Sequence, residues 1–242
     1  MHLIGLDVGF SATSRTNALA EIENGELRLV KLTVSERDAK LARLRDVDVI
    51  AIDAPLVPAD CAIDRPRLVE QIFCRGPFQK KCKPGASHVP GTGQLLRKHG
   101  ALSADAIARA ARWSTPPPFP TIIDGAGVVE AFPNAFLGVA VPEETYAARP
   151  KLPRGGKFDW LYDEWIKAGL FPASVLRSGL PLELVDTLHG ERDHEKRAAL
   201  VCLLTAAFAA TGRAKAVGDA ATGYFFLPEI DLWATWARHA LH

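Results

Sequence analysis

Two short stretches, HLIGLDVG (residues 2–9) and VDVIAIDAPL (residues 47–56), decide the fold that this sequence predicts. Each is an apolar run of strand length that ends in an acid and is then broken by a glycine or a proline. The second run is apolar on both faces, as in a strand that helices cover on both sides. Asp7 and Asp53 therefore stand at strand ends, where a buried carboxylate is costly unless it is paired, protonated or bound to a cation.

The stretch between them predicts a hairpin and a helix. Residues 17–34 alternate apolar and polar side chains on either side of Asn24-Gly25, the strongest local indication of a β-hairpin. Residues 35–46 carry apolar side chains at helical spacing, with Ser35 as the expected N-cap. The chain thus predicts three antiparallel strands, a helix and a second buried strand.

The remaining sequence predicts mainly helices, after a less regular stretch at residues 58–120. We expect that stretch, which includes a helix near 103–113, to be an insertion into a single domain spanning residues 1–242. Later on we expect a short strand that carries Glu130 and is closed by Pro133. The other expected elements are helices around 157–169, 181–188 and 193–211, a tight turn and short strand over 216–228, and a closing helix over 229–241.

Composition places the chain among globular proteins of the cytoplasm. It has 242 residues, 48% of them hydrophobic, which is enough for a full core. No apolar run reaches the length of a membrane span, and the N-terminus lacks the pattern of a signal peptide. Four cysteines are too few for a disulfide scaffold, so reduced thiols are expected. A zinc site remains as an alternative, with the ligands Cys61, Cys74, Cys82 and His88, although their spacing lacks the usual close cysteine pair.

The acidic residues at the predicted strand ends and at one helix start indicate a metal centre. Asp7, Asp53 and Glu130 each lie near the end of a strand, and Asp193 and Glu195 lie at the start of the clearest helix. Carboxylates that converge repel one another and need cations. Oxygen ligands with room for water suit Mg²⁺ or Mn²⁺, and two such ions about 3.5–4 Å apart support phosphodiester hydrolysis. The sequence therefore predicts catalysis by Asp7, Asp53, Glu130 and Glu195, with Asp193 as a further metal ligand.

The order of these elements is that of the ribonuclease H-like fold: a strand acid, a hairpin, a helix, a second strand acid and a later helix acid. The motifs GLDVGF, VIAIDAPL, VVEAFPNAFLG, HEKRAALVCLLTAAFA and GDAATGYFFLP also resemble the domain of unknown function 429 family. This resemblance, which covers residues 3–228, implies a ribonuclease H-like α/β fold and a nuclease activity that rests largely on the fold. The chain departs from the family at Ala198, where related members often carry a second helix acid.

A basic segment provides the expected contact with a nucleic acid. Between residues 65 and 98, eight Lys and Arg residues stand against the single acid Glu70. Such a segment near a metal centre suits a polyanion, although a solvated surface loop has the same composition. The residues expected to contact the substrate are Gly9, Ser11, Arg75, Lys80, Lys81, Lys83 and His88.

Two other functions fit the same residues. In an ATP-binding protein of the actin and sugar-kinase type, the loop after the first strand, with Ser11, Thr13 and Ser14, would approach the phosphates. Such proteins normally need two domains of this kind. A non-catalytic nucleic-acid-binding protein is the third interpretation, and Ala198 is the residue that favours it.

Overall fold

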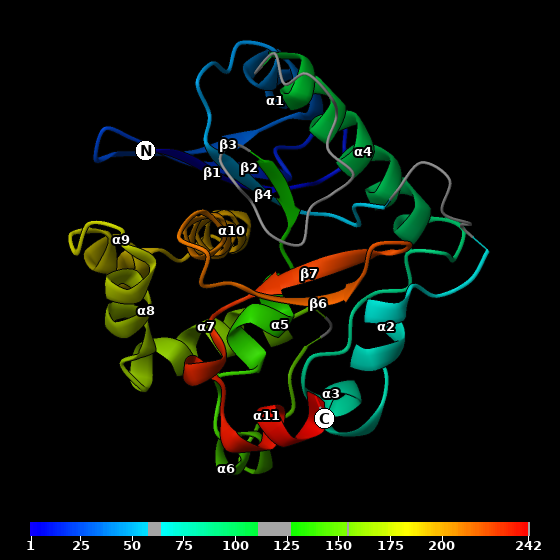
Figure 1. The fold of residues 1–242 in the computed structure, drawn as a ribbon, viewed down its shortest axis with the longest axis vertical. Helices are drawn as coiled ribbons and strands as arrows, with labels where there is room; N and C mark the ends of the chain where they lie inside the picture. The colour runs from blue at the N-terminus through cyan, green and yellow to red at the C-terminus, as the bar shows by residue number, and fades with distance from the viewer. Residues whose placement is uncertain (58–63, 111–126, 154, 242) are drawn as a thin grey trace.

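A mixed five-stranded sheet forms the centre of the molecule (Figure 1). The computed structural model describes residues 1–57, 64–110, 127–153 and 155–241. The strands are β1 (His2–Asp7), β2 (Asn17–Glu23), β3 (Glu26–Leu32), β4 (Val49–Asp53) and β5 (Gly127–Glu130). They lie in the order β3-β2-β1-β4-β5, the first three antiparallel to one another and β1, β4 and β5 parallel. The predicted α/β architecture with an antiparallel start is confirmed.

The turn at Asn24-Gly25 confirms the predicted hairpin. Asn24 has φ 52° and Gly25 has φ 85°, which is the left-handed conformation that a two-residue hairpin turn requires at both positions. Glu23 pairs with Glu26 directly on either side of the turn. This pairing fixes which side chains of β3 face which side of the sheet.

Helices cover both faces of the sheet. On one face α1 (Val34–Leu41) and α4 (Thr92–Ala110) pack on the strands, and α10 (His194–Ala210) lies across the other (Figure 1). The helix starts differ from prediction. Thr33, and not Ser35, caps α1, because its Oγ1 accepts the Glu36 N–H at 3.3 Å and the Glu36 carboxylate accepts the Thr33 N–H at 2.8 Å.

Helix α4 begins well before the predicted start at residue 103, since it contains two glycines that read as loop residues. Both glycines lie where another part of the chain comes close. A Cβ at Gly93 would be 2.0 Å from the carbonyl oxygen of Ala86, and one at Gly100 would be 2.7 Å from the Cβ of Ala54. Close packing therefore outweighs the low helix propensity of glycine here.

Helix α10 rests directly on the backbone of β1. A Cβ at Gly5 would lie 2.1 Å from the amide nitrogen of Leu203 and 2.2 Å from the carbonyl oxygen of Ala199. No larger side chain fits between the strand and the helix. This contact sets the position of the helix start, with its acids, relative to the end of β1.

The second sheet is a two-stranded hairpin of β6 (Lys215–Asp219) and β7 (Gly223–Leu227), where the sequence predicted one short strand. Three of the remaining helices correspond to predicted ones, namely α7 (Lys157–Lys167), α9 (Leu184–Gly190) and α11 (Thr235–Leu241), which follows the 3₁₀ turn η1 (Ile230–Leu232). The helices that were not predicted are α2 (Leu68–Phe73), α3 (Gly76–Lys81), α5 (Pro133–Gly138), α6 (Glu143–Ala147) and α8 (Leu170–Ser178). In the described part of the chain, no helix has the length and apolar character needed to cross a bilayer.

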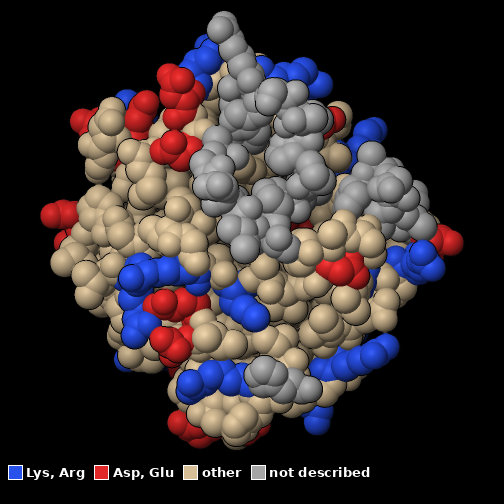
Figure 2. All heavy atoms as spheres, in the orientation of Figure 1, with Lys and Arg blue, Asp and Glu red and all other residues tan. Residues whose placement is uncertain are grey.

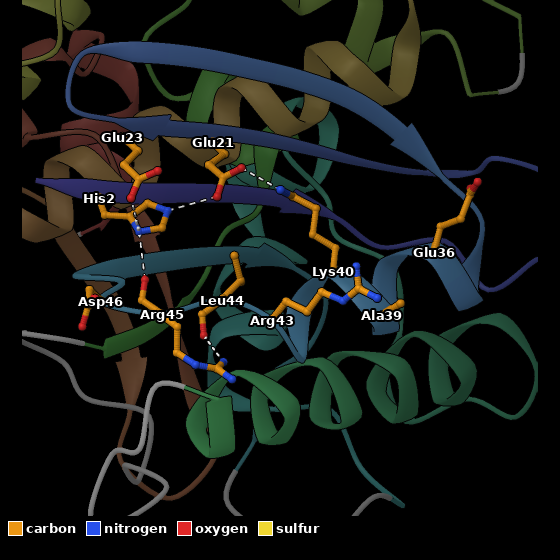
Figure 3. A pocket seen from close by; sticks show the side chains of 10 residues that line it. All are labelled: His2, Glu21, Glu23, Glu36, Ala39, Lys40, Arg43, Leu44, Arg45 and Asp46. Atoms are coloured by element: carbon orange, nitrogen blue, oxygen red, sulfur yellow. Dashed lines mark hydrogen bonds and ion pairs between the residues drawn. The ribbon is translucent and has the colours of Figure 1, made fainter.

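An ion-pair network lies at the end of the sheet where β1 begins, on the wall of a pocket (Figure 3), and His2 and Glu21 are its buried members. The Nε2 of His2 lies 3.1 Å from Oε1 of Glu21, and Lys40 donates to Oε2 of Glu21 at 2.7 Å. The hydrogen bond with His2 is the main cause that lowers the pKa of Glu21 to about 2, with Lys40 adding to it against the cost of burial. The same bond raises the pKa of His2.

This network predicts a pH-dependent effect of the substitution Glu21→Gln. Because the folded pKa of Glu21 is depressed, its contribution to stability is present above its unfolded pKa of 4.5 and is lost as the pH falls toward about 2. At pH 6 we expect the variant to lose about 1.5–3 kcal/mol of unfolding free energy, the usual range for a hydrogen bond to a charged group. Urea denaturation at pH 6 and pH 2.5 measures the difference, which should shrink at the lower pH. The exposed Glu26→Gln is the control, and an equal loss at both pH values would contradict the assignment.

Candidate functional site

One row of residues crosses the sheet at the end of β1. Lys31 on β3 pairs with Ala18 on β2, Ala18 pairs with Asp7 on β1, and Asp7 pairs with Asp53 on β4. Directly paired residues of neighbouring strands point to the same face. That face is the one covered by α10, because Gly5, two residues before Asp7, touches the helix.

Asp7 and Asp53 form a pair of carboxylates at the ends of two adjacent parallel strands. Among the described residues, no donor lies within hydrogen-bonding distance of either carboxylate. Burial, followed by the charges of Asp53 and Glu195, raises the pKa of Asp7 well above its usual range, and Lys31 opposes this shift. Burial and the charge of Glu130 raise the pKa of Asp53 to about 7. Both carboxyl groups therefore keep their protons to a higher pH than free aspartates do.

The start of α10 brings two more acids to this row. Asp193 caps the helix, since its Oδ1 accepts the Lys196 N–H at 3.1 Å. Glu195 lies one helical turn before Ala199, the residue that touches Gly5, and its charge acts on Asp7. Lys31 donates to Oδ2 of Asp193 and to Oε2 of Glu195, both at 2.9 Å. Nothing in the sequence around Lys31 predicts this role.

Glu130 does not join the row, which corrects its prediction as a metal ligand. It pairs with Ile52 and not with Asp53, so its side chain leaves β5 on the opposite face. There Arg67 holds both of its oxygens, at 2.7 and 2.8 Å, and the Leu56 N–H donates to it at 2.7 Å. Arg67 also donates to Glu70 at 3.0 Å. Glu130 belongs to a buried ion-pair network and has no free oxygen to offer a metal.

Only some of the basic side chains in the segment between residues 65 and 98 are exposed at the surface. Arg75, Lys80 and Lys83 are exposed, whereas Lys81 is buried, bonded to Glu143 at 2.6 Å and 4.2 Å from the ring centre of Trp236. Lys81 is thus engaged in internal contacts and is not the exposed cation that its predicted role requires. On the face in Figure 2, the described basic groups alternate with acidic ones and form no continuous basic surface.

The loop after β1 is held by its own contacts. A Cβ at Gly9 would lie 2.2 Å from Oγ1 of Thr16, so this glycine makes room for Thr16 and not for a substrate. The Gly9 N–H donates to Oδ1 of Asn17 at 3.0 Å, and its carbonyl accepts from the buried Arg37 at 3.2 Å. Ser11 accepts the Ser14 N–H at 3.1 Å. The predicted contact of Gly9 with a phosphate therefore has no free backbone N–H to make it, which also weakens the ATP-binding alternative.

A cavity of about 90 Å³ lies beside Asp53. Its walls include the Arg67–Glu130 ion pair, the rings of Phe132 and Phe225, and Gly85 and Ser87 of the basic segment. Ser87 is 2% exposed, and its hydroxyl has no hydrogen-bond partner among the described residues. The basic segment thus comes close to Asp53 through the loop that contains Gly85 and Ser87. His88 lies next to this loop, with its Nδ1 3.8 Å from Oε2 of Glu70.

The zinc alternative gains no support from the residues that can be placed. Cys61 lies outside the described residues. Cys82 is fully buried, and burial raises the pKa of its thiol to about 12, which disfavours the thiolate that zinc requires. Within the described ranges, no three or more His, Cys, Asp or Glu side chains form a group that could hold a metal ion as they stand.

Comparison of the chain with models of protein families, with curated proteins and with solved structures finds no match. The chemistry of the site must therefore be judged from its own residues. Asp7 and Asp53 fit a divalent cation as two adjacent oxygen donors, and among the described residues no Lys or Arg is hydrogen-bonded to either of them. Glu195 lies near enough to act on Asp7 but is bonded to Lys31.

The raised pKa of Asp53 predicts that Asp53→Asn stabilises the metal-free protein at alkaline pH. The contribution of a carboxyl with a raised pKa is present below its unfolded value of 3.8 and is lost as the pH rises through about 7. At pH 8 we expect the variant to gain about 1–2 kcal/mol, less than the full conversion of the shift because the side chain is partly exposed. Thermal unfolding in chelator at pH 8 and pH 4.5 measures this gain, which should be largest at pH 8. The exposed Asp105→Asn is the matched control, and destabilisation by Asp53→Asn at pH 8 would refute the interpretation.

Proposed function

We propose that this protein is a metal-dependent nuclease of the ribonuclease H-like class, which hydrolyses phosphodiester bonds of a nucleic acid with Mg²⁺ or Mn²⁺. The observation that carries the proposal is the pairing of Asp7 with Asp53 at the ends of two central parallel strands, where no Lys or Arg of the described residues is hydrogen-bonded to either carboxylate. Two adjacent, partly buried carboxylates that repel each other supply what a divalent ion needs.

The fold supports this class. A mixed sheet with three antiparallel strands first, a strand acid on β1, a second on β4 and a third acid on a late helix is the arrangement expected of a ribonuclease H-like protein. The resemblance of the sequence motifs to the domain of unknown function 429 family points to the same class. A fold alone does not define a reaction, so the proposed activity depends mainly on the pair Asp7 and Asp53.

The residues divide the work as follows. Asp7 and Asp53 would hold the ion, and Glu195 on α10 stands beside Asp7. When bound, the ion supplies an activated water and stabilises the charge that develops on the phosphate oxygens. The exposed Arg75, Lys80 and Lys83 precede the loop that lines the cavity beside Asp53, and they would contact the backbone of the nucleic acid.

We expect Asp7→Asn to abolish cleavage while leaving the fold intact. The substitution removes one carboxylate from the pair, so that ion binding and turnover are both lost. Cleavage of single- and double-stranded DNA, RNA and a DNA–RNA hybrid is measured with Mg²⁺, Mn²⁺ or chelator, and a loss of at least about 100-fold is expected for removal of a metal ligand at the reacting centre. Asp105→Asn should leave activity unchanged.

The outcome of a thermal-shift assay separates the alternatives. Mn²⁺ should raise the Tm of the wild-type protein at pH 8 and should leave that of Asp7→Asn unchanged. Ion binding and nucleic-acid binding without cleavage of any substrate would favour the non-catalytic interpretation. The absence of any Mn²⁺ effect on the wild-type protein, together with the absence of cleavage, would refute the nuclease.

A further inference from the structure

We infer that Lys31 occupies the place of a second cation, so that the acidic site takes one divalent ion and not two. This inference rests on the proposed metal-binding function of the site. It assigns Lys31 as a positioning residue, which holds two of the four acids while Asp7 and Asp53 hold the ion.

The contacts of the Lys31 ammonium carry the inference. It lies 2.9 Å from Oδ2 of Asp193 and 2.9 Å from Oε2 of Glu195, and the side chain is 27% exposed. Both acids are separated from Lys31 by more than 160 residues of sequence, so the contact is made by the packing of α10 against the sheet. A positive charge between two carboxylates stands where a metal ion would otherwise bridge them.

The register explains how Lys31 reaches this place. Lys31, Ala18 and Asp7 stand side by side on three neighbouring strands and share a face of the sheet. Strand spacing puts Lys31 and Asp7 about 10 Å apart at the backbone. Ala18 between them is fully buried and has only a methyl group, which leaves room for the long lysine side chain above it. The ammonium can therefore approach the acids from the side opposite to Asp53.

The charges in the site then favour a single ion. The ammonium of Lys31 is bonded to Asp193 and Glu195, so Asp7 and Asp53 remain available to one divalent cation. Glu195 is the acid that a second ion would need beside Asp7, but one of its oxygens is bonded to the ammonium. A second divalent ion would also have to approach the ammonium, which repels it. Removal of the ammonium should free Glu195 and Asp193 for a second ion.

The stoichiometry of Mn²⁺ binding tests this inference. Calorimetric titration of the whole chain at pH 7.5 should give one Mn²⁺ for the wild-type protein and two for Lys31→Met. The double variant Lys31→Met with Glu195→Gln should return to one, because the acid that the second ion needs is gone. Lys167→Met is the matched control, since Lys167 also bonds a carboxylate, that of Glu164, but on the exposed surface of α7.

A second variant, Lys31→Gln, tests the same inference if Lys31→Met folds poorly. Lys31→Gln keeps a hydrogen-bond donor toward the acids without the charge, and it should also bind two ions. In both variants Mn²⁺ should raise the Tm by more than in the wild-type protein. Two ions in the wild-type protein, or one ion in both variants, would overturn the role of Lys31 and leave the nuclease proposal standing. No ion in the wild-type protein and none in the variants would overturn both.

Discussion

Direct contact between helix α10 and the backbone of β1 at Gly5 is the constraint on which the site depends. The contact leaves no room for a Cβ, so the helix cannot slide or lift without opening a gap in the core. One turn toward the start of α10 lies Glu195, and two residues along β1 lies Asp7. A missing side chain in one strand thus places an acid from a late helix next to an acid from the first strand.

The register of the parallel strands decides which acids lie together, and this register could not be predicted from the sequence. Acids at the ends of β1, β4 and β5 could be found from apolar runs and their terminating residues. Their pairing could not, because a shift of one residue moves a side chain to the other face. Asp7 faces Asp53, but Glu130 pairs with Ile52 and leaves on the opposite side. Strand ends are local in sequence, whereas register depends on packing between distant segments.

The roles of Lys31 and Arg67 could not be predicted from the sequence for a related reason. Lys31 reads as one of several polar residues that alternate along a hairpin, and Arg67 reads as part of a basic surface segment. Each finds its partners only through tertiary structure, on α10 for Lys31 and on β5 for Arg67. The hairpin turn at Asn24-Gly25 and the limits of α10 were predictable, since they depend on local backbone preferences and on capping.

Two groups of acids at one end of the sheet meet the cost of burial in different ways. Glu130 has an internal guanidinium that bonds both of its oxygens, and Arg67 itself is bonded on its other side by Glu70. In that arrangement both oxygens of Glu130 are already hydrogen-bonded within the chain. Asp7 and Asp53 have no such partner in the part of the chain that the structure describes, although Lys31 lies in the same row of the sheet and is bonded to Asp193 and Glu195 instead. Two like charges at adjacent strand ends repel each other, so this pair on its own costs the fold stability. The proposed metal site depends on that uncompensated cost, which a bound divalent ion would offset.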